Sequence, residues 1–254
     1  MNDKQLHIRK KTAKNSKVFL LMLSLIMVLC NYAQAESPIH PDRPGFSTGT
    51  YTVNPGTVYL EMGYEYNFSS QNLKPNYHKF PHTNIRFGLL PNLEMNVAWE
   101  GLKVTNDLKF TDALGLGAKY RLAKADSYNI SLLGKVDFSD FANNTHITPL
   151  LGLLWDYELT SHFGTFGVVQ LSHEGLEDFC AEASLGLAFP LGEHFHIHGE
   201  YFIRAYPKHN DLTHNADIGI TYHITHDIQV DAFFATGLAS DAFRHVGCGF
   251  AKRF

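Results

Sequence analysis

Three histidines stand at alternate positions in the last third of the sequence, and their type suits metal binding. His194, His196 and His198 alternate with apolar residues, and Glu200 continues the row. In a β-strand, side chains two positions apart point to the same face, as a shared metal site would need. Such side chains also lie about 6–7 Å apart, so three consecutive members rarely reach one ion. We therefore expect no metal site and no other cofactor.

A second group of histidines and acidic residues lies in the longer polar stretches, and two of its members could form an acid–base pair. The group contains His146, His173, Glu174, Asp178, His209, Asp211 and His245. No spacing within it identifies a nucleophile, and no elbow motif frames a serine. We therefore expect that the protein is not an enzyme.

Charged side chains of both signs recur at positions of one parity, together with glycine, serine and asparagine. They are Glu61, Glu65, Arg86, Glu94, Glu100, Lys119, Arg121, Lys135, Asp137, Glu182, Glu200, Arg204, Asp217, Asp231 and Arg253. A face with both signs of charge suits either a hydrated passage or a network of ion pairs that fills a narrow barrel. Both interpretations require secondary-structure elements that point these charged side chains toward the interior of the barrel.

These elements are predicted to be strands, because the apolar residues recur with a period of two. In the first segment, Val58, Leu60 and Met62 oppose Glu61 and Gly63, and similar segments follow to the end of the chain. A soluble β-sandwich also alternates in this way. The segments are about ten residues long and their connections alternate between short and long, which favours a barrel that crosses a membrane.

We expect an all-β fold, in which residues 57–254 form a transmembrane, antiparallel, up-and-down β-barrel of about twelve strands. Short connections are predicted at residues 91–92, 124–125, 160–161, 191–192 and 225–226. The second strand is predicted to be short, because it begins after Pro81, and the seventh alternates poorly; ten or fourteen strands are the alternatives. The sheet must close, because unpaired edge groups in hydrocarbon cost several kcal/mol each.

The first 35 residues have the pattern of a cleaved secretory signal peptide. A basic stretch precedes the apolar run of residues 18–30, which is too short to cross a bilayer comfortably as a helix. Ala33 and Ala35 then supply the small residues that a signal peptidase accepts. We expect a mature chain that begins at Glu36 and lies in the outer membrane of a Gram-negative-type bacterium. The formal charge of −4 and the absence of a basic cluster after residue 35 argue against nucleic acid as a partner.

Residues 36–56 are predicted to be an irregular periplasmic leader or plug. Four prolines, at positions 38, 41, 44 and 55, prevent a regular strand throughout this stretch. We expect it to fold into or under the periplasmic mouth, with Asp42 and Arg43 paired to inward charges. The alternative is a disordered leader.

The end of the chain carries a feature of barrel assembly. Phe254 is the last residue, and Phe250, Cys248 and Val246 share its parity. A terminal aromatic residue at the end of a lipid-facing stripe resembles the signature by which the barrel-assembly machinery recognises its clients. We therefore expect this machinery and outer-membrane lipid as partners.

The two ends of the mature chain resemble a known family. The matching stretches are residues 42–47 (DRPGFS), 53–56 (VNPG), 60–64 (LEMGY), 217–222 (DIGITY), 227–231 (DIQVD) and 247–254 (GCGFAKRF). They are similar to the outer-membrane "transporter" family named for the meta-pathway of phenol degradation. This resemblance implies a β-barrel that moves small, often aromatic or hydrophobic, compounds. Gly45 departs from the family, in which an acidic or polar residue is commoner.

Together, these observations predict a porin-like transporter or channel for small-molecule solutes. Passage would be gated by the leader and the outer loops, and no residue would carry chemistry. One alternative is an outer-membrane enzyme that acts on lipid or peptide at the outer rim, where the second group of histidines and acidic residues would lie. The other is a structural or surface-interaction barrel.

Overall fold

The computed structural model describes residues 37–69, 76–105, 108–110, 113–139, 141, 145–174, 178–239 and 243–254. The predicted signal peptide lies outside these residues. None of the described helices is long and apolar enough to cross a membrane. The strands are β1 (Val58–Ser69), β2 (Tyr77–Leu90), β3 (Leu93–Trp99), β4 (Leu102–Val104), β5 (Leu108–Phe110), β6 (Leu114–Lys124), β7 (Tyr128–Ser139), β8 (His146–Thr160), β9 (Phe163–Glu174), β10 (Asp178–Leu191), β11 (Phe195–Tyr206), β12 (Asp211–Thr225), β13 (Ile228–Gly237) and β14 (Phe243–Arg253), with a short 3-10 helix, η2 (Pro207–His209).

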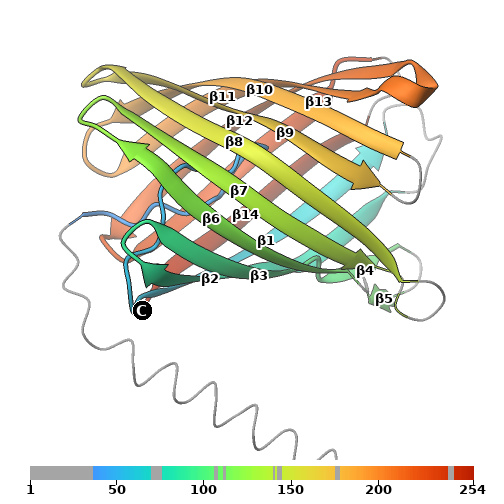
Figure 1. Ribbon diagram of the computed structural model, residues 1–254, viewed down its shortest axis with the longest axis horizontal. Helices are drawn as coiled ribbons and strands as arrows, with labels where there is room; N and C mark the ends of the chain where they lie inside the picture. The colour runs from blue at the N-terminus through green and yellow to red at the C-terminus, as the bar shows by residue number, and fades with distance from the viewer. Residues whose placement is uncertain are drawn as a thin grey trace, which may run out of the picture.

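The strands form a closed barrel, because β1 pairs with both β2 and β14 (Figure 1). Neighbouring strands of the wall are antiparallel throughout. Twelve of the described strands make up the wall, and β4 and β5 extend from β2 as an additional hairpin. The predicted twelve-stranded antiparallel barrel is confirmed. The small hairpin occupies a stretch that the sequence indicated to be a loop.

The last residue closes the barrel at its seam. The N–H of Phe254 donates to the carbonyl oxygen of Val58 (2.9 Å), and the carbonyl oxygen of Phe254 accepts from the N–H of Val58 (3.3 Å). In Figure 1 the C-terminus lies at the same end of the barrel as the short turns, and the blue N-terminal segment enters the barrel there. The longer connections lie at the opposite end, as the predicted topology requires.

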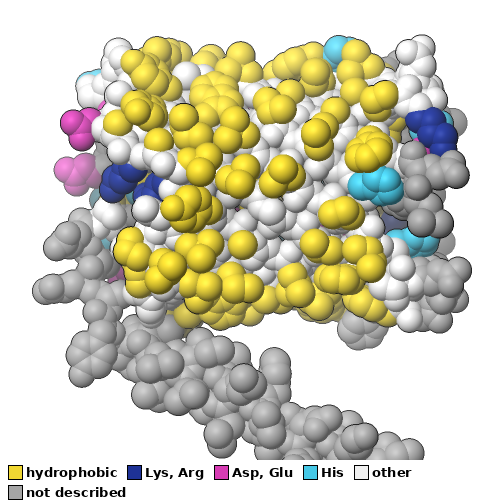
Figure 2. Space-filling view, viewed as in Figure 1, with side chains coloured by type: hydrophobic (Ala, Val, Ile, Leu, Met, Phe, Trp, Pro, Cys, Tyr) yellow, Lys and Arg dark blue, Asp and Glu magenta, His cyan; other side chains and the backbone are white. Residues whose placement is uncertain are grey.

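The outward side chains form an apolar surface around the wall (Figure 2). Leu116, Leu151 and Ile218, for example, are 44%, 57% and 55% exposed. On the opposite parity, Lys119 and Glu94 are 1% and 2% exposed. An apolar surface of this extent is incompatible with water and is typical of a barrel whose outer face contacts lipid.

Strand β2 is longer than the sequence predicted, because it continues through Pro81. The pairing of β2 with β1 shifts in register between Gly63 and Glu65, which pair with His82 and Lys79. Pro81 therefore falls within the irregularity, where its missing N–H removes no regular ladder hydrogen bond. The prediction that this strand begins after the proline was wrong for this reason.

Strand β9 alternates poorly in sequence because an apolar residue points into the barrel. Val168 is buried in a cluster with Leu133 and Leu154, whereas Val169 and Leu171 are exposed on the outside. Both faces of β9 are therefore apolar at this level, which hides the period of two. The cluster lies against the N-terminal part of the chain.

Candidate functional site

Residues 37–56, here named the inner segment, lie inside the barrel (Figure 1). Backbone hydrogen bonds hold both of its ends. The N–H of Ile39 donates to His226 (2.8 Å), and the N–H of Gly56 donates to Gly88 (3.1 Å). Between these points the prolines prevent a regular strand, so the polar backbone groups of the inner segment need partners from the side chains of the wall.

Three carboxylates surround two cations in the part of the lumen nearest the short turns. Arg86 contacts Glu94 (Nη2–Oε2, 2.8 Å), Glu61 (Nη1–Oε1, 3.0 Å) and Asp42 of the inner segment (Nη1–Oδ1, 3.3 Å). Lys119 contacts Asp42 (2.7 Å) and Glu94 (3.4 Å). The four wall residues are buried almost completely. Because each charge lies beside opposite charges, removal of one member would leave another buried and uncompensated.

The same network binds the backbone of the inner segment. The Arg86 guanidinium donates to the carbonyl oxygens of His40 (3.0 Å) and Tyr51 (2.7 Å). In return, the N–H of Val53 donates to Glu94 Oε2 (2.7 Å). Hydrogen bonds in which one partner is ionised are stronger than neutral ones. The wall charges therefore fix the path of the inner segment as well as neutralise one another.

Arg43 of the inner segment forms a second buried ion pair with the wall. Its Nη2 and Nε atoms lie 3.0 and 3.3 Å from the two carboxylate oxygens of Asp231 on β13. Its guanidinium packs over Gly63 and Gly249, where an added Cβ would overlap the guanidinium atoms. Its carbonyl oxygen accepts a hydrogen bond from Gln229 (3.3 Å). The absence of side chains at the two glycines creates the space that Arg43 fills.

The turn of the inner segment at Gly45 is held by two carboxylates. The N–H of Phe46 lies 3.2 Å from Glu200 Oε2 and 3.1 Å from Asp217 Oδ2. Ser47 donates its N–H to Glu200 (3.0 Å), and its hydroxyl also contacts that carboxylate. Gly45 has φ 106°, a conformation that side chains with a Cβ rarely adopt. This backbone conformation favours glycine at position 45.

Phe46 projects from this turn into an apolar part of the lumen. Its ring stacks on Phe202 with a centroid distance of 4.2 Å and an interplanar angle of 2°. It also packs against the cluster of Leu133, Leu154 and Val168. The sequence did not predict this apolar part of the lumen, because lumen positions were predicted from charged residues alone. The poor alternation of β9 was the available signal.

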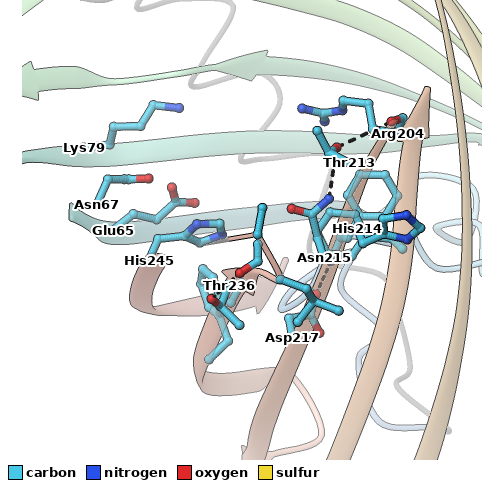
Figure 3. A pocket seen from close by; sticks show the side chains of 18 of the residues that line it. Glu65, Asn67, Lys79, Arg204, Thr213, His214, Asn215, Asp217, Thr236 and His245 are labelled. Carbon is cyan, nitrogen blue, oxygen red and sulfur yellow. Dashed lines mark hydrogen bonds between the residues drawn. The ribbon is translucent and has the colours of Figure 1, made fainter. Parts of the chain in front are cut away.

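Two cavities lie on either side of residues 44–47. The larger, of about 1350 Å³, is lined by Gly45 and Phe46 together with residues of β1, β2 and β11–β14, and we name it the outer vestibule (Figure 3). The smaller, of about 410 Å³, is lined by Pro44 and Ser47 and by residues of β8–β13, and we name it the inner cavity. The inner segment thus forms the partition between a space that faces the longer loops and one that faces the short turns.

Other predicted lumen charges are paired locally, mostly toward the longer loops. Lys135 Nζ lies 3.0 Å from Asp137 Oδ1 on the same strand, β7. Arg204 on β11 binds Glu182 on β10. Glu65 lines the outer vestibule and, among the described residues, has no ion pair or hydrogen bond. Of these residues, Arg204 and Glu65 line the outer vestibule.

The last three predicted lumen charges also have individual partners. Glu100 contacts Lys79 near the vestibule. At the rim with the short turns, Arg253 binds Asp227 (Nε–Oδ1, 2.7 Å), and Arg121 donates to a backbone carbonyl of the β2–β3 turn (3.0 Å). Apart from Glu65, the charges that we predicted for the lumen thus contact the inner segment, a neighbour on the wall, or, as Arg253 does, both.

The histidine row, which begins in the β10–β11 turn and continues on β11, has a different environment at each position. His194 Nδ1 lies 3.0 Å from the carbonyl oxygen of His223, and the ring of His196 lies edge-on to the ring of His223 (5.2 Å). His198 Nε2 faces Asp217 Oδ1 (3.4 Å). In the described ranges, no three His, Cys, Asp or Glu side chains are grouped so that they could hold one metal ion. The row instead contributes to the wall around the inner segment.

The residues considered for acid–base chemistry are distributed among separate contacts. Asp178 lies 3.1 Å from His209 in an exposed ion pair at the rim. His173 packs edge-on against Phe179, and His245 lines the outer vestibule from β14. The side chain of Glu174 lies outside the described residues. The described members of the group therefore do not form one constellation.

His40 is a titratable group enclosed by the inner segment and the wall. Its ring stacks on Tyr51 with a centroid distance of 4.0 Å. The pKa of His40 is lowered to about 4, mainly by burial and also by the nearby positive charge of Arg86 and by His223. His40 is therefore neutral when the inner segment occupies the lumen at neutral pH.

The closed wall, the apolar outer surface and the charged interior define a transmembrane β-barrel of the outer-membrane type. Three solved structures share the fold. The chain is similar to the KdgM porin (TM-score 0.56, 8% identity, 76% of this chain and 99% of that one) and to the NanC porin (0.56, 10%, 76% and 98%). It is also similar to an outer-membrane channel from Pseudomonas putida F1 (0.58, 12%, 84% and 99%). No protein-family model and no curated protein matches the sequence.

Proposed function

We propose that the protein is a channel for small solutes across the outer membrane and that the inner segment closes it. The observation that carries this proposal is the partition at residues 44–47. The outer vestibule and the inner cavity lie on either side of it, so displacement of Phe46 and its neighbours would join the two spaces. The chain needs no catalytic group for this role, because diffusion alone would move the solute.

The gate proposed here is the Phe46–Phe202 pair, and the charged network is its anchor. The pair is held mainly by apolar contact, in which one ring can leave the other without exposing a buried charge. Asp42 and Arg43, in contrast, are bound by buried ions of the wall. We infer that the side chain of Phe46 moves first, while the backbone of its turn stays bound to Glu200 and Asp217.

The solutes proposed for this channel are small and include aromatic or hydrophobic compounds. The apolar patch around Phe46 supports this class, because a solute that passes the partition must contact it. The resemblance of residues 42–64 and 217–254 to the family named for the meta-pathway of phenol degradation supports the same class. We propose membership of that family, and a role without enzymatic activity, on these grounds.

We also propose lipid and the barrel-assembly machinery as partners. The apolar surface would contact the hydrocarbon of the membrane, and the N-terminal 35 residues would direct export before their removal. Phe254 would serve as the assembly signal, since it ends β14 beside the closing seam with β1.

Single-channel conductance in planar bilayers tests the channel. Refolded mature protein with Phe46→Ala is expected to show discrete openings at least about tenfold more often than the unsubstituted protein, because the loss of a buried ring contact removes a few kcal/mol from the closed state. Phe189→Ala is the matched control, since this ring is 40% exposed on the outside of β10.

A folded Phe46→Ala protein that stays silent, together with a silent variant lacking residues 37–46, would count against passage through the lumen. The rim would then be examined next. His209→Ala leaves conductance unchanged if the protein is a channel, whereas loss of a lipid- or peptide-modifying activity in this variant would favour the enzyme alternative.

A further inference from the structure

We propose that the outer vestibule is a binding site for an organic cation that has an aromatic or apolar body. This inference rests on the proposed function, because the vestibule would be the entrance of the channel, and it adds the chemical class of the ligand. The volume of about 1350 Å³ is ample for a small organic molecule. Figure 3 shows the polar side chains that surround this space.

The described lining of the vestibule carries an excess of negative charge. Its ionic side chains, with histidine counted as neutral, are Glu65, Glu100, Asp211, Asp217, Lys79 and Arg204. Lys79 is bound by Glu100 and also faces Glu65 across the β1–β2 pairing, and Arg204 is bound by Glu182 on the neighbouring strand. Both cations are therefore neutralised by carboxylates of the wall. The remaining carboxylates give the cavity a field that attracts cations and repels anions.

Glu65 and Asn67 mark the place where a charged head group would lie. They stand two positions apart on β1 and line the same side of the vestibule (Figure 3). Asn67 is only 6% exposed, yet its Nδ2 atom has no hydrogen-bond partner among the described residues. Buried amides are normally paired, so this one indicates a missing polar partner. A ligand that places an ammonium group at Glu65 and a hydrogen-bond acceptor at the Asn67 amide would satisfy both side chains.

A second carboxylate lies on the same row of the wall. The register connects Asn67 to His245, His245 to Ala235, and Ala235 to Asp217 across four adjacent strands. Asp217 accepts the N–H of Phe46 through Oδ2 (3.1 Å), and His198 Nε2 faces its buried Oδ1 at 3.4 Å. The row thus has a carboxylate near each end, Glu65 and Asp217, and their charge favours a cation.

Aromatic rings cover the side of the vestibule nearest the inner segment. Phe46 and Phe202 are stacked there, and Phe233 packs edge-on against His245 (5.8 Å). Ring faces attract cations and also bury apolar surface. A cation with an aromatic or apolar body can therefore place its charged head near the carboxylates and pack its body against these rings. The carboxylates would repel an anion at the same place.

A series of probes that share one ring tests this inference. Benzylamine, benzyl alcohol and benzoate are titrated calorimetrically into refolded mature protein in detergent micelles at pH 7, and heats into empty micelles are subtracted. Benzylamine is expected to bind about tenfold more tightly than benzyl alcohol, and benzoate least tightly. Glu65→Gln should reduce benzylamine binding by about fivefold and leave benzyl alcohol unchanged. Glu193→Gln, at the exposed β10–β11 turn, is the matched control.

Equal binding of the three probes, or tightest binding of benzoate, would overturn the proposal. Heat-modifiable migration in gels would reveal whether Glu65→Gln folds. If it does not, the three probes on the unsubstituted protein still test the proposal. Binding is measured here without passage. Preferential binding of benzylamine by a protein that stays silent after Phe46→Ala would support the cation site and contradict the channel. Channel openings without this preference would support the channel and contradict only the cation site.

Discussion

Arg43 and Asp231 are separated by 188 positions in the sequence and are joined by two hydrogen bonds of 3.0 and 3.3 Å inside the barrel. Their side chains are 10% and 0% exposed. The pair connects the inner segment to β13, next to Asp42, which joins the network around Arg86. The inner segment is thus fixed to the wall at Asp42 and Arg43 before its turn at Gly45, and again at Tyr51 and Val53 after the turn.

Replacement of Arg43 is expected to loosen the inner segment without opening the wall. Arg43→Ala leaves Asp231 buried without its partner, and such losses cost about 3–5 kcal/mol. Limited proteolysis in micelles should then cut within residues 36–56 faster than in the unsubstituted protein. The double variant Arg43→Ala/Asp231→Ala should lose less than the sum of the two single variants. Lys208→Ala, in an exposed ion pair, is the control; equal protease sensitivity of both would contradict the assignment.

A methyl group at Gly88 is expected to displace the end of the inner segment. An added Cβ would overlap the carbonyl oxygen of Asn54, which belongs to the backbone and cannot move as a side-chain end would. Gly88→Ala should therefore reduce thermal stability by about 1–3 kcal/mol. Gly134→Ala is the matched control, because its Cβ would meet nothing within 4 Å, and its effect should stay within about 0.5 kcal/mol. Similar melting temperatures for the two variants would show that Asn54 does not pack there.

Acid is expected to weaken the binding of the inner segment through His40. The pKa of His40 is about 4 in the lumen, against 6.5 for a free imidazole. Between these two pKa values, His40 is protonated when the segment is released and neutral when the segment is bound. Binding of the inner segment is therefore strongest above pH 6.5 and weakens as the pH falls toward 4. At pH 5 the loss is about 2 kcal/mol.

Channel openings or proteolysis followed from pH 7.5 to 4.5 would measure this dependence. The charged and titratable groups that face His40 are His196, His223, Arg86 and Arg253. His40→Gln should flatten the profile, and His162→Gln, in the exposed β8–β9 turn, should not. An unchanged profile in His40→Gln would assign the acid response to another group.

The side chain of Phe254 is expected to matter for assembly more than for stability. Its hydrogen bonds to Val58 come from the backbone and survive replacement by alanine, whereas the contact of its ring with Lys252 (4.6 Å) is worth only about 0.5–1 kcal/mol. Phe254→Ala should therefore refold in vitro but reach the outer membrane of cells at several-fold lower level. Phe189→Ala is the control, and equal levels of both would remove Phe254 as an assembly signal.

Much of the barrel could be predicted because its determinants are local. Alternating polarity fixes which side chains of a strand share a face, and short polar breaks fix where a hairpin turns. The exceptions have local causes as well: the register shift opposite Pro81 lengthened β2, and the inward Val168 obscured the alternation of β9. The register shift leaves no pattern in a single sequence, whereas the inward Val168 leaves only the poor alternation of β9.

The sequence by itself determined the twelve strands, the inward parity of the charges and the irregular nature of residues 36–56, because periodicity and proline content act within a few residues. Only the tertiary structure decided which charges meet. Arg86 reaches Glu61 because β2 pairs with β1, and it reaches Asp42 because the inner segment lies inside the closed wall. Phe46 contacts Phe202 across 156 positions for the second of these reasons. Contacts of this kind depend on register and barrel diameter, which are properties of all strands jointly and of no single segment.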